Sequence, residues 1–210
     1  MMQHSETMDN RGLLHTIFES QVSSSPNRNA IQTYTLGSCQ TITYHELNSE
    51  ANMIARQIRS TKLPQVIRFA ICMDKGPNLV AIILAVLKLG CAWSPIDPKA
   101  PVKRKIAILQ ELGSCHLLVA PEYAADFQHC PSSTSIFVWD DLISRAASVQ
   151  DGDNLQGVDC IPDSPCHILW TSGSTGVPKG QFKSPVPSFF VSRLIQTHIR
   201  GGYFPSIRCK

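Results

Sequence analysis

Between residues 66 and 147 the sequence alternates short apolar runs with helical patterns, and this alternation limits the folds available to the chain. The apolar runs are typical of buried strands, and the segments between them place apolar residues at helical spacing. Such alternation predicts βαβ units, in which helices cover both faces of a parallel sheet. The expected strands are residues 66–73, 91–96, 116–120, 135–139 and 166–169, and the expected helices are 79–89, 102–112 and 140–147. We therefore expect an α/β fold with a largely parallel sheet flanked by helices.

The segment before this alternation carries its own local signals. Apolar residues at helical spacing predict an amphipathic helix over residues 12–22. Two strand-like runs, 30–35 and 40–44, then flank a short turn and predict a β-hairpin. Thr43 with Glu46 three residues later forms a capping box, which predicts a second helix that begins there and continues to about residue 59.

The distribution of charge argues against a nucleic-acid partner. The chain has 210 residues and a formal net charge of +3. Five of its basic residues lie in the segment 181–210, which has no acidic residue, and the other 180 residues carry 14 basic and 16 acidic side chains. The body is therefore slightly acidic, and a basic surface for nucleic acid is not expected on it.

Neither the cysteines nor the hydropathy points to a metal centre or a membrane. The eight cysteines are scattered, without a C-x-x-C pair or a spacing typical of zinc ligands. We expect most of them to be reduced and structural. No apolar run reaches the roughly 18 residues of a membrane span, and residues 1–10 lack the apolar core of a signal peptide. We therefore expect a cytoplasmic protein with no membrane partner.

Two charged groups near residue 100 receive structural interpretations. We interpret Lys103, Arg104 and Lys105 as the solvated flank of a helix whose buried stripe includes Val102. Asp97 and Arg104 are interpreted as a local brace beside a rigid, proline-containing connector.

The richest chemical signal is the segment Trp170-Thr171-Ser172-Gly173-Ser174-Thr175-Gly176-Val177-Pro178-Lys179-Gly180. Glycines allow a backbone to turn tightly and to bring its N–H groups close to a ligand. Successive N–H groups in such a turn form an anion site, and hydroxyl groups add further donors. A lysine supplies positive charge for phosphate oxygens. We predict that phosphate groups are bound by Thr171, Ser172, Gly173, Ser174, Thr175, Gly176 and Lys179; that these phosphates belong to a nucleotide is what the family resemblance described below implies.

Two other interpretations of this segment compete with a phosphate site of this kind. A flexible Ser/Gly surface loop has the same composition. A P-loop of the NTPase type needs the order G-x-x-x-x-G-K-[ST]. Here Gly173 and Gly176 are too close together, Pro178 precedes the lysine, and Gly180 follows it. The order of residues therefore argues against a P-loop NTPase.

The same order resembles the nucleotide-phosphate loop of the adenylate-forming (AMP-binding) enzymes, in which Tyr or Phe commonly stands at the position of Trp170. Two further segments resemble the adenylation domains of nonribosomal peptide synthetases in particular. The first begins at Leu14-His15 and includes Phe18-Glu19, and the Thr43-Tyr44-x-Glu46-Leu47 entry follows it. The second is Leu87-Lys88-Leu89-Gly90-Cys91-Ala92-Trp93-Ser94-Pro95-Ile96-Asp97-Pro98, with Trp93 where Tyr is usual.

This resemblance covers residues 12–180 and implies the N-terminal part of an adenylation domain. Members of that family join an amino acid or other carboxylic acid to AMP, using ATP with Mg2+ and releasing pyrophosphate. The segment 181–210 departs from the family pattern, and we expect it to be a separate basic, proline-containing tail. The family's binding motifs for adenine, ribose and the substrate carboxylate come later in sequence, so the chain is expected to be a truncated product. We assign no catalytic residue and no metal ligand in it.

Two alternatives to an active enzyme fragment follow from the resemblance. The chain could be a catalytically inactive remnant that binds nucleotide weakly or binds a partner, including itself, through an exposed sheet edge. It could also be a piece of a ligase related to the acyl-CoA synthetases. The helix-start and Asp-Pro segments favour the peptide synthetases over these ligases. The residues that select the acid are not expected within the chain.

Overall fold

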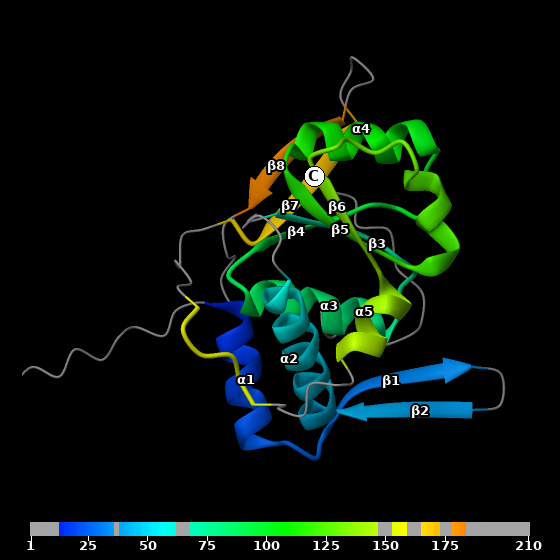
Figure 1. Cartoon of the computed structure of the whole chain (residues 1–210). Helices are drawn as coiled ribbons and strands as arrows, with labels where there is room; N and C mark the ends of the chain where they lie inside the picture. The colour runs from blue at the N-terminus through cyan, green and yellow to red at the C-terminus, as the bar shows by residue number, and fades with distance from the viewer. Residues whose placement is uncertain are drawn as a thin grey trace, which may run out of the picture.

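A computed structural model describes residues 13–35, 38–61, 68–146, 153–158, 165–172 and 178–183 of the chain. It has α/β architecture, and the predicted fold class is confirmed (Figure 1). The strands are β1 (Asn29–Thr35), β2 (Ser38–Thr43), β3 (Arg68–Cys72), β4 (Ala92–Pro95), β5 (Cys115–Val119), β6 (Thr134–Val138), β7 (His167–Ser172) and β8 (Pro178–Lys183). The helices are α1 (Leu14–Ser24), α2 (Tyr44–Ser60), α3 (Pro77–Lys88), α4 (Val102–Leu112) and α5 (Trp139–Ala146), with a 3₁₀ helix, η1, at Pro121–Phe127.

The central sheet has six strands in the order β6-β5-β3-β4-β7-β8. Strands β6, β5, β3, β4 and β7 are parallel, whereas β8 is antiparallel to β7. Strands β1 and β2 form a separate antiparallel hairpin, as the sequence predicts. Figure 1 shows this hairpin projecting from the body beside the start of α2.

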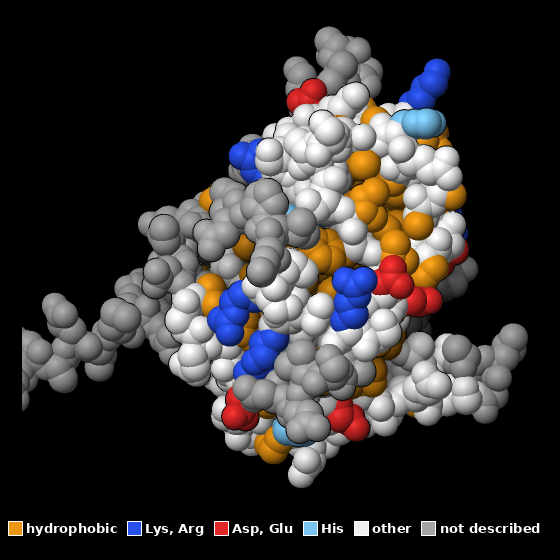
Figure 2. Space-filling model, in the orientation of Figure 1, with side chains coloured by type: hydrophobic (Ala, Val, Ile, Leu, Met, Phe, Trp, Pro, Cys, Tyr) orange, Lys and Arg blue, Asp and Glu red, His pale blue; other side chains and the backbone are white. Residues whose placement is uncertain are grey.

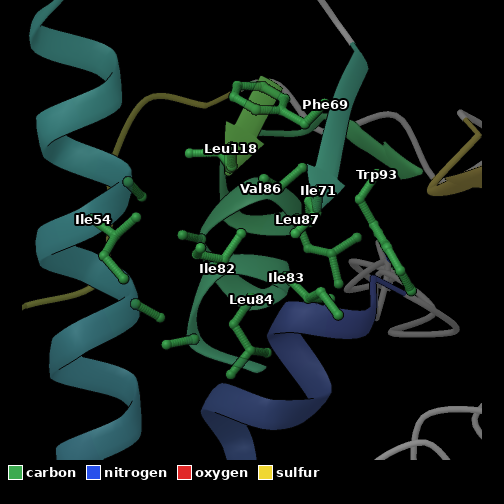
Figure 3. Packing of buried hydrophobic residues seen from close by; sticks show 14 of the residues in the cluster. Ile54, Phe69, Ile71, Ile82, Ile83, Leu84, Val86, Leu87, Trp93 and Leu118 are labelled. Carbon is green, nitrogen blue, oxygen red and sulfur yellow. The ribbon is translucent and has the colours of Figure 1, made fainter. Parts of the chain in front are cut away.

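Helices cover both faces of the central sheet, so that each face has its own apolar cluster. On one face α1, α2 and α3 pack against Phe69, Ile71 and Trp93, and α3 is buried from Ala81 to Lys88 (Figure 3). On the other face α4 and η1 pack against Ala70, Cys72 and Ile168. This layering explains why the strands are apolar on both faces, as expected of a covered parallel sheet.

Local sequence signals determine where several helices begin and end. The Thr43 side chain accepts a hydrogen bond from the Glu46 N–H at 3.2 Å, and Glu46 Oε2 accepts one from the Thr43 N–H at 2.8 Å. This is the predicted capping box, at the start of α2. Gly90 follows α3 with a φ of 71°, and Gly113 ends α4 with a φ of 69°. Both glycines have a positive φ, which glycine adopts more readily than other residues because it has no Cβ atom.

The structure corrects the predicted buried face of α4. Lys105, which was interpreted as part of a solvated flank, is only 1% exposed, while the neighbouring Lys103 is exposed. Val102, which was expected in the buried stripe, is 45% exposed, and the buried apolar residues are Ile108, Leu109 and Leu112. The ammonium group of Lys105 has partners inside the fold, described below, and these partners offset the cost of its burial.

The predicted brace between Asp97 and Arg104 is also wrong. Asp97 Oδ1 accepts a hydrogen bond from the backbone N–H of Lys99 at 2.9 Å, so its carboxylate stabilises the turn in which it lies. Within the described part of the chain, no ion pair joins Asp97 to Arg104, which lies half-buried on α4.

Candidate nucleotide-binding site

The predicted phosphate segment lies at the turn between β7 and β8. These two strands are antiparallel neighbours, and the Cα atom of Ser172 pairs with that of Pro178. One step further from the turn, Thr171 is the partner of Lys179. The structure therefore brings the two ends of the segment, Thr171-Ser172 and Lys179, to adjacent positions on two strands. Gly173, Ser174, Thr175 and Gly176 lie outside the described residues, as do the side chains of Thr171, Ser172 and Lys179.

The position of this turn in the sheet is one at which ligands commonly bind. Strand β7 is parallel to β4, so the turn that follows Ser172 leaves the sheet at the carboxyl ends of the parallel strands. In open α/β sheets, ligands bind in the crevice outside this edge. Topology thus places the hydroxyl- and glycine-rich segment where a bound phosphate is expected.

The base of the β7–β8 hairpin is attached to β4 by a tryptophan. Trp170 Nε1 donates a hydrogen bond to Ser94 Oγ, with 2.6 Å between the two atoms. Ser94 lies on β4 and is completely buried. A Cβ atom added at Gly180 would lie 3.0 Å from two carbon atoms of the Trp170 ring. The indole therefore lies over the backbone of β8 at the point where the sequence has glycine.

A second aromatic contact joins β4 to β7 on the side of α1 and α3. The rings of Trp93 and His167 stack with centroids 4.0 Å apart and planes 11° from parallel. Their Cα atoms are register partners, and the Trp93 N–H donates to the carbonyl of Cys166 at 3.1 Å. Burial lowers the pKa of the His167 imidazole to about 4. His167 is therefore neutral at physiological pH and acts as an aromatic packing group.

Charged and polar groups also gather near the carboxyl ends of β3 and β5. The ammonium of Lys105 donates to the carbonyl of Pro98 at 2.6 Å and pairs with Asp126 Oδ2 at 2.5 Å. It also lies 5.3 Å from the centre of the Tyr123 ring. The Tyr123 hydroxyl donates to Asp74 Oδ2 at 2.7 Å. This hydrogen bond, with burial as a lesser cause, raises the pKa of Tyr123 to about 12.

Lys105 and Asp126 form an ion pair, Asp74 accepts from the neutral Tyr123 hydroxyl, and these groups do not form a metal site. Among the residues that the structure describes, no three His, Cys, Asp or Glu side chains are close enough to hold a metal ion. The described cysteines are free thiols, and burial raises the pKa of Cys72 to about 12.

The chemistry of the predicted phosphate-binding residues fits ATP without a metal ligand from the described chain. Hydroxyl groups, glycine N–H groups and a lysine are donors suited to phosphate oxygens. The sequence predicts a phosphate-binding role for these residues, and that role stays a prediction; it does not reveal which residues contact the strands that flank them. The sequence near Trp170 gives no sign of its hydrogen bond to Ser94, because the two residues are far apart in the chain. The sequence of α4 likewise gives no sign that Lys105 is buried, because its partners Pro98 and Asp126 lie outside this helix.

Comparison with known proteins gives a consistent result. Residues 18–183 match the model of the AMP-binding enzyme family. The siderophore peptide synthetase fer3 of Mycosarcoma maydis is 31% identical over 204 residues, which are 90% of this chain and 4% of that protein. The chain thus spans only a small part of the length of this relative.

Solved structures share the fold. The N-terminal subdomain of NpsA from Klebsiella oxytoca superposes with a TM-score of 0.68 at 23% identity, over 83% of this chain and 42% of that one. A fatty acyl CoA synthetase of Mycobacterium tuberculosis superposes with a TM-score of 0.71 at 20% identity, over 89% of this chain and 42% of that one. At these identities the likeness supports the fold alone.

Proposed function

Because the chain belongs to the family of AMP-binding enzymes, we propose that it is part of an adenylation domain that activates an amino acid, or another carboxylic acid, in nonribosomal peptide biosynthesis. In this reaction a carboxylate oxygen of the acid bonds to the α-phosphorus of ATP. The bond between the α-phosphorus and the oxygen that bridges it to the β-phosphate breaks, and pyrophosphate leaves with that oxygen. The product is an acyl-adenylate.

One observation carries the proposal: the hydroxyl- and glycine-rich segment connects β7 to β8 at the carboxyl edge of a parallel sheet. We propose that Thr171, Ser172, Gly173, Ser174, Thr175, Gly176 and Lys179 bind the phosphates of ATP. Donors fixed before the substrate arrives stabilise developing charge without reorganising during the reaction. Magnesium that accompanies ATP would neutralise part of the phosphate charge.

The similarity to peptide synthetases favours an amino acid as the substrate, and it agrees with the two further signatures around Glu19 and Lys88. The fold is shared with a fatty acyl CoA synthetase, which supports a second candidate, part of an acyl-CoA synthetase-like ligase. A remnant with weak nucleotide binding is the third. The division into a domain at 12–180 and a tail at 181–210 stays a prediction, and both β8 and the family match continue to residue 183.

The predictions about location and about other partners do not concern the reaction. No helix in the described part of the chain is long and apolar enough to cross a bilayer. The cytoplasmic location, the absence of a nucleic-acid partner and self-association through a sheet edge stay predictions.

The proposal is tested by ATP binding and by ATP–pyrophosphate exchange on the full chain. We expect Lys179→Ala to weaken ATP binding by ten- to a hundredfold, because a hydrogen bond to a charged group contributes about 1.5–3 kcal/mol. Thr175→Ala should weaken it by a smaller factor. The matched control is Lys103→Ala, which removes an equal charge from the exposed side of α4.

Exchange with amino acids, abolished by Lys179→Ala, would support the peptide-synthetase proposal, and exchange with fatty acids alone would support the second candidate. ATP binding without exchange would support the remnant. A folded chain whose ATP binding is absent, or is equally strong in Lys179→Ala, would contradict the phosphate site.

A further inference from the structure

Few backbone contacts attach the β7–β8 hairpin to the rest of the sheet. Strand β8 is an edge strand that pairs with β7 in the described part of the chain. Strand β7 pairs with β4 at a single register position, Trp93 with His167. The turn that carries the predicted phosphate ligands begins after Ser172, five residues further along the same strand. Because this pairing lies at the first residue of β7, other contacts are needed to hold the last residues of β7, up to Ser172, against β4.

Trp170 contacts both strands beside its own at that far end. Its Nε1 donates to the buried hydroxyl of Ser94 at 2.6 Å, on β4. Its ring lies against Gly180, the residue of β8 that is its register partner. A Cβ atom at position 180 would be 3.0 Å from the ring and 3.5 Å from Ile168 Cγ2. The indole therefore links three neighbouring strands, two residues before the turn.

We propose that Trp170 is a positioning residue for the nucleotide-phosphate loop. It holds the base of the β7–β8 hairpin to β4 through Ser94 and through its contact with Gly180, so that Thr171 and Lys179, at the two ends of the predicted loop, stay at adjacent positions. Small displacements of a binding group weaken its interactions strongly, and supporting contacts keep such groups in place. This proposal rests on the proposed function, because positioning matters only if the loop binds a nucleotide.

The hydrogen bond from residue 170 to Ser94 depends on having tryptophan at this position. A phenylalanine at this position has no ring N–H and cannot donate to Ser94. A buried hydroxyl that loses its partner is costly, so the Ser94 side chain and the indole depend on each other. Gly180 belongs to the same arrangement, because a Cβ atom there would lie 3.0 Å from the Trp170 ring, and the indole would have to shift by a few tenths of an ångström to accommodate it.

Three substitutions test the proposal, and each one changes a different part of the contact between Trp170, Ser94 and Gly180. Trp170→Phe removes the donor and keeps an aromatic ring, Ser94→Ala removes the acceptor, and Gly180→Ala places a methyl group against the ring. The control is Trp139→Phe, at the start of α5 on the other face of the sheet. Each full-length variant is measured by amide hydrogen exchange of residues 179–183 and by titration with ATP and Mg2+.

We expect each of the three variants to speed amide exchange in β8 by about tenfold and to raise the dissociation constant for ATP by about fivefold, each factor corresponding to the loss of one hydrogen bond or less. Trp139→Phe should change neither quantity. In the NMR spectrum, Ser94→Ala should shift one of the three indole N–H signals, that of Trp170, and make it exchange faster with water. The double variant Trp170→Phe/Ser94→Ala should change amide exchange and the dissociation constant no more than the more severe single variant does, because both substitutions remove the same hydrogen bond.

Each contrary result has a distinct meaning. Unchanged exchange in β8 for variants that remain folded would overturn the proposal. Faster exchange with an unchanged dissociation constant would overturn it as well, because Trp170 would then stabilise the strand without positioning the loop. If the unsubstituted chain does not bind ATP, the proposed function fails, and amide exchange and the indole signal still decide whether Trp170 and Ser94 hold the hairpin. If Trp170→Phe does not fold, Ser94→Ala provides the same comparison.

Discussion

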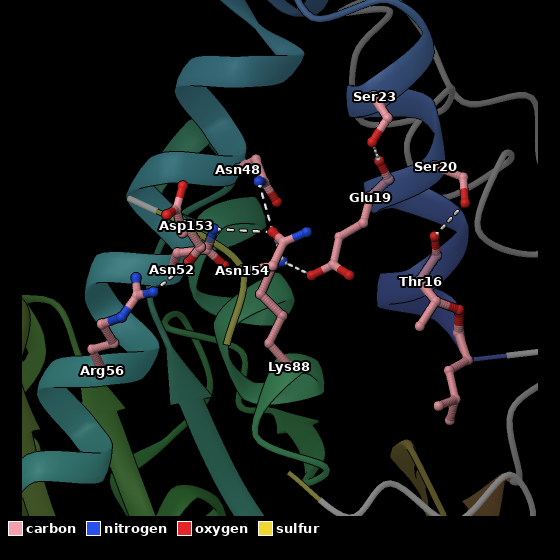
Figure 4. A network of polar contacts seen from close by, with 11 residues as sticks. Thr16, Glu19, Ser20, Ser23, Asn48, Asn52, Arg56, Lys88, Asp153 and Asn154 are labelled. Carbon is pink, nitrogen blue, oxygen red and sulfur yellow. Dashed lines mark hydrogen bonds and ion pairs between the residues drawn. The ribbon is translucent and has the colours of Figure 1, made fainter. Parts of the chain in front are cut away.

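Glu19 and Lys88 show how two separate signature segments of the sequence meet in space. Glu19 lies on α1 in the first segment, and Lys88 ends α3 in the second. The Lys88 ammonium, which is almost completely buried, pairs with the Glu19 carboxylate and donates to Asn154 Oδ1 at 3.3 Å (Figure 4). Asn154 Oδ1 also accepts hydrogen bonds from Asn48 and Asn52 of α2. The network therefore joins α1, α2, α3 and the segment 153–158.

Burial lowers the pKa of Lys88, while the hydrogen bond and the charge of Glu19 act in the opposite direction. Removing Glu19 would leave a buried ammonium without its counter-charge. We expect Glu19→Gln to lower the free energy of unfolding by about 3 kcal/mol, the range seen when one partner of a buried pair is removed. Urea denaturation measures the change. The double variant Glu19→Gln/Lys88→Met should recover part of this loss, since no buried charge is left.

Lys103→Met, on the exposed side of α4, is the control for removal of a lysine charge. It should change the free energy of unfolding by less than about 0.5 kcal/mol, as most surface substitutions do. If Glu19→Gln were as mild as Lys103→Met, the ion pair would not stabilise the packing of α1 on α3. If the loss of unfolding free energy in Glu19→Gln/Lys88→Met equalled the sum of the two single losses, the ion pair would likewise not stabilise this packing.

At the scale of single elements, the end of α4 depends on a glycine. Gly113 has a φ of 69°, in the left-handed region that other residues seldom occupy. Arg68 Nη1 donates to the carbonyl of Leu112 at 2.6 Å, so the last turn is also attached to β3. We expect Gly113→Ala to lower the free energy of unfolding by about 1 kcal/mol through strain at this position. Chemical denaturation of the purified chain measures this change.

Gly76 is the matched control for this substitution. It precedes α3 with an extended φ of 174°, and an added Cβ atom would meet no atom within 4 Å. Gly76→Ala should therefore leave the stability unchanged or raise it slightly, because alanine reduces the conformational entropy of the unfolded chain. Equal losses from the two substitutions would show that the conformation at Gly113 is not the cause.

Most elements were predictable because their signals are local. The capping box of Thr43 and Glu46, and the terminating residues Gly90 and Gly113, placed helix ends to within a few residues. The 3₁₀ helix η1 was missed, because a helix of seven residues is too short to show a clear periodicity in the sequence. Strand β8 was missed too, since Pro178 and Gly180 are depleted in strands. Pairing with β7 overrides that local preference.

The candidate site was only partly predictable from the sequence. The phosphate segment was recognisable because its residues are consecutive, and the alternation of strands and helices implied that it would follow a parallel strand. Lys105 was misplaced because its partners, Pro98 and Asp126, lie outside α4. A local pattern in one helix does not reveal which residues another segment brings beside it. The attachment of Trp170 to Ser94 was missed for the same reason.

For the molecule as a whole, the arrangement of the sheet determines which strand edges are open to another chain. In the described part of the chain, β6 pairs only with β5 and is the edge opposite β8. Hydrophobic side chains reach the surface near β6 in the view of Figure 2. Ile136, in the middle of this strand, is 42% exposed. Unpaired edges with exposed apolar residues promote association between chains.

We expect Ile136→Lys to reduce concentration-dependent association of the full chain, because charged side chains on an edge strand oppose pairing with another edge. The matched control is Val102→Lys, since Val102 is 45% exposed but lies on a helix. Both changes add one positive charge and remove an exposed apolar side chain. Light scattering across a range of concentrations should therefore show reduced association for Ile136→Lys and little change for Val102→Lys. An equal reduction by both would assign the effect to net charge, and unchanged association in Ile136→Lys would show that chains do not meet at β6.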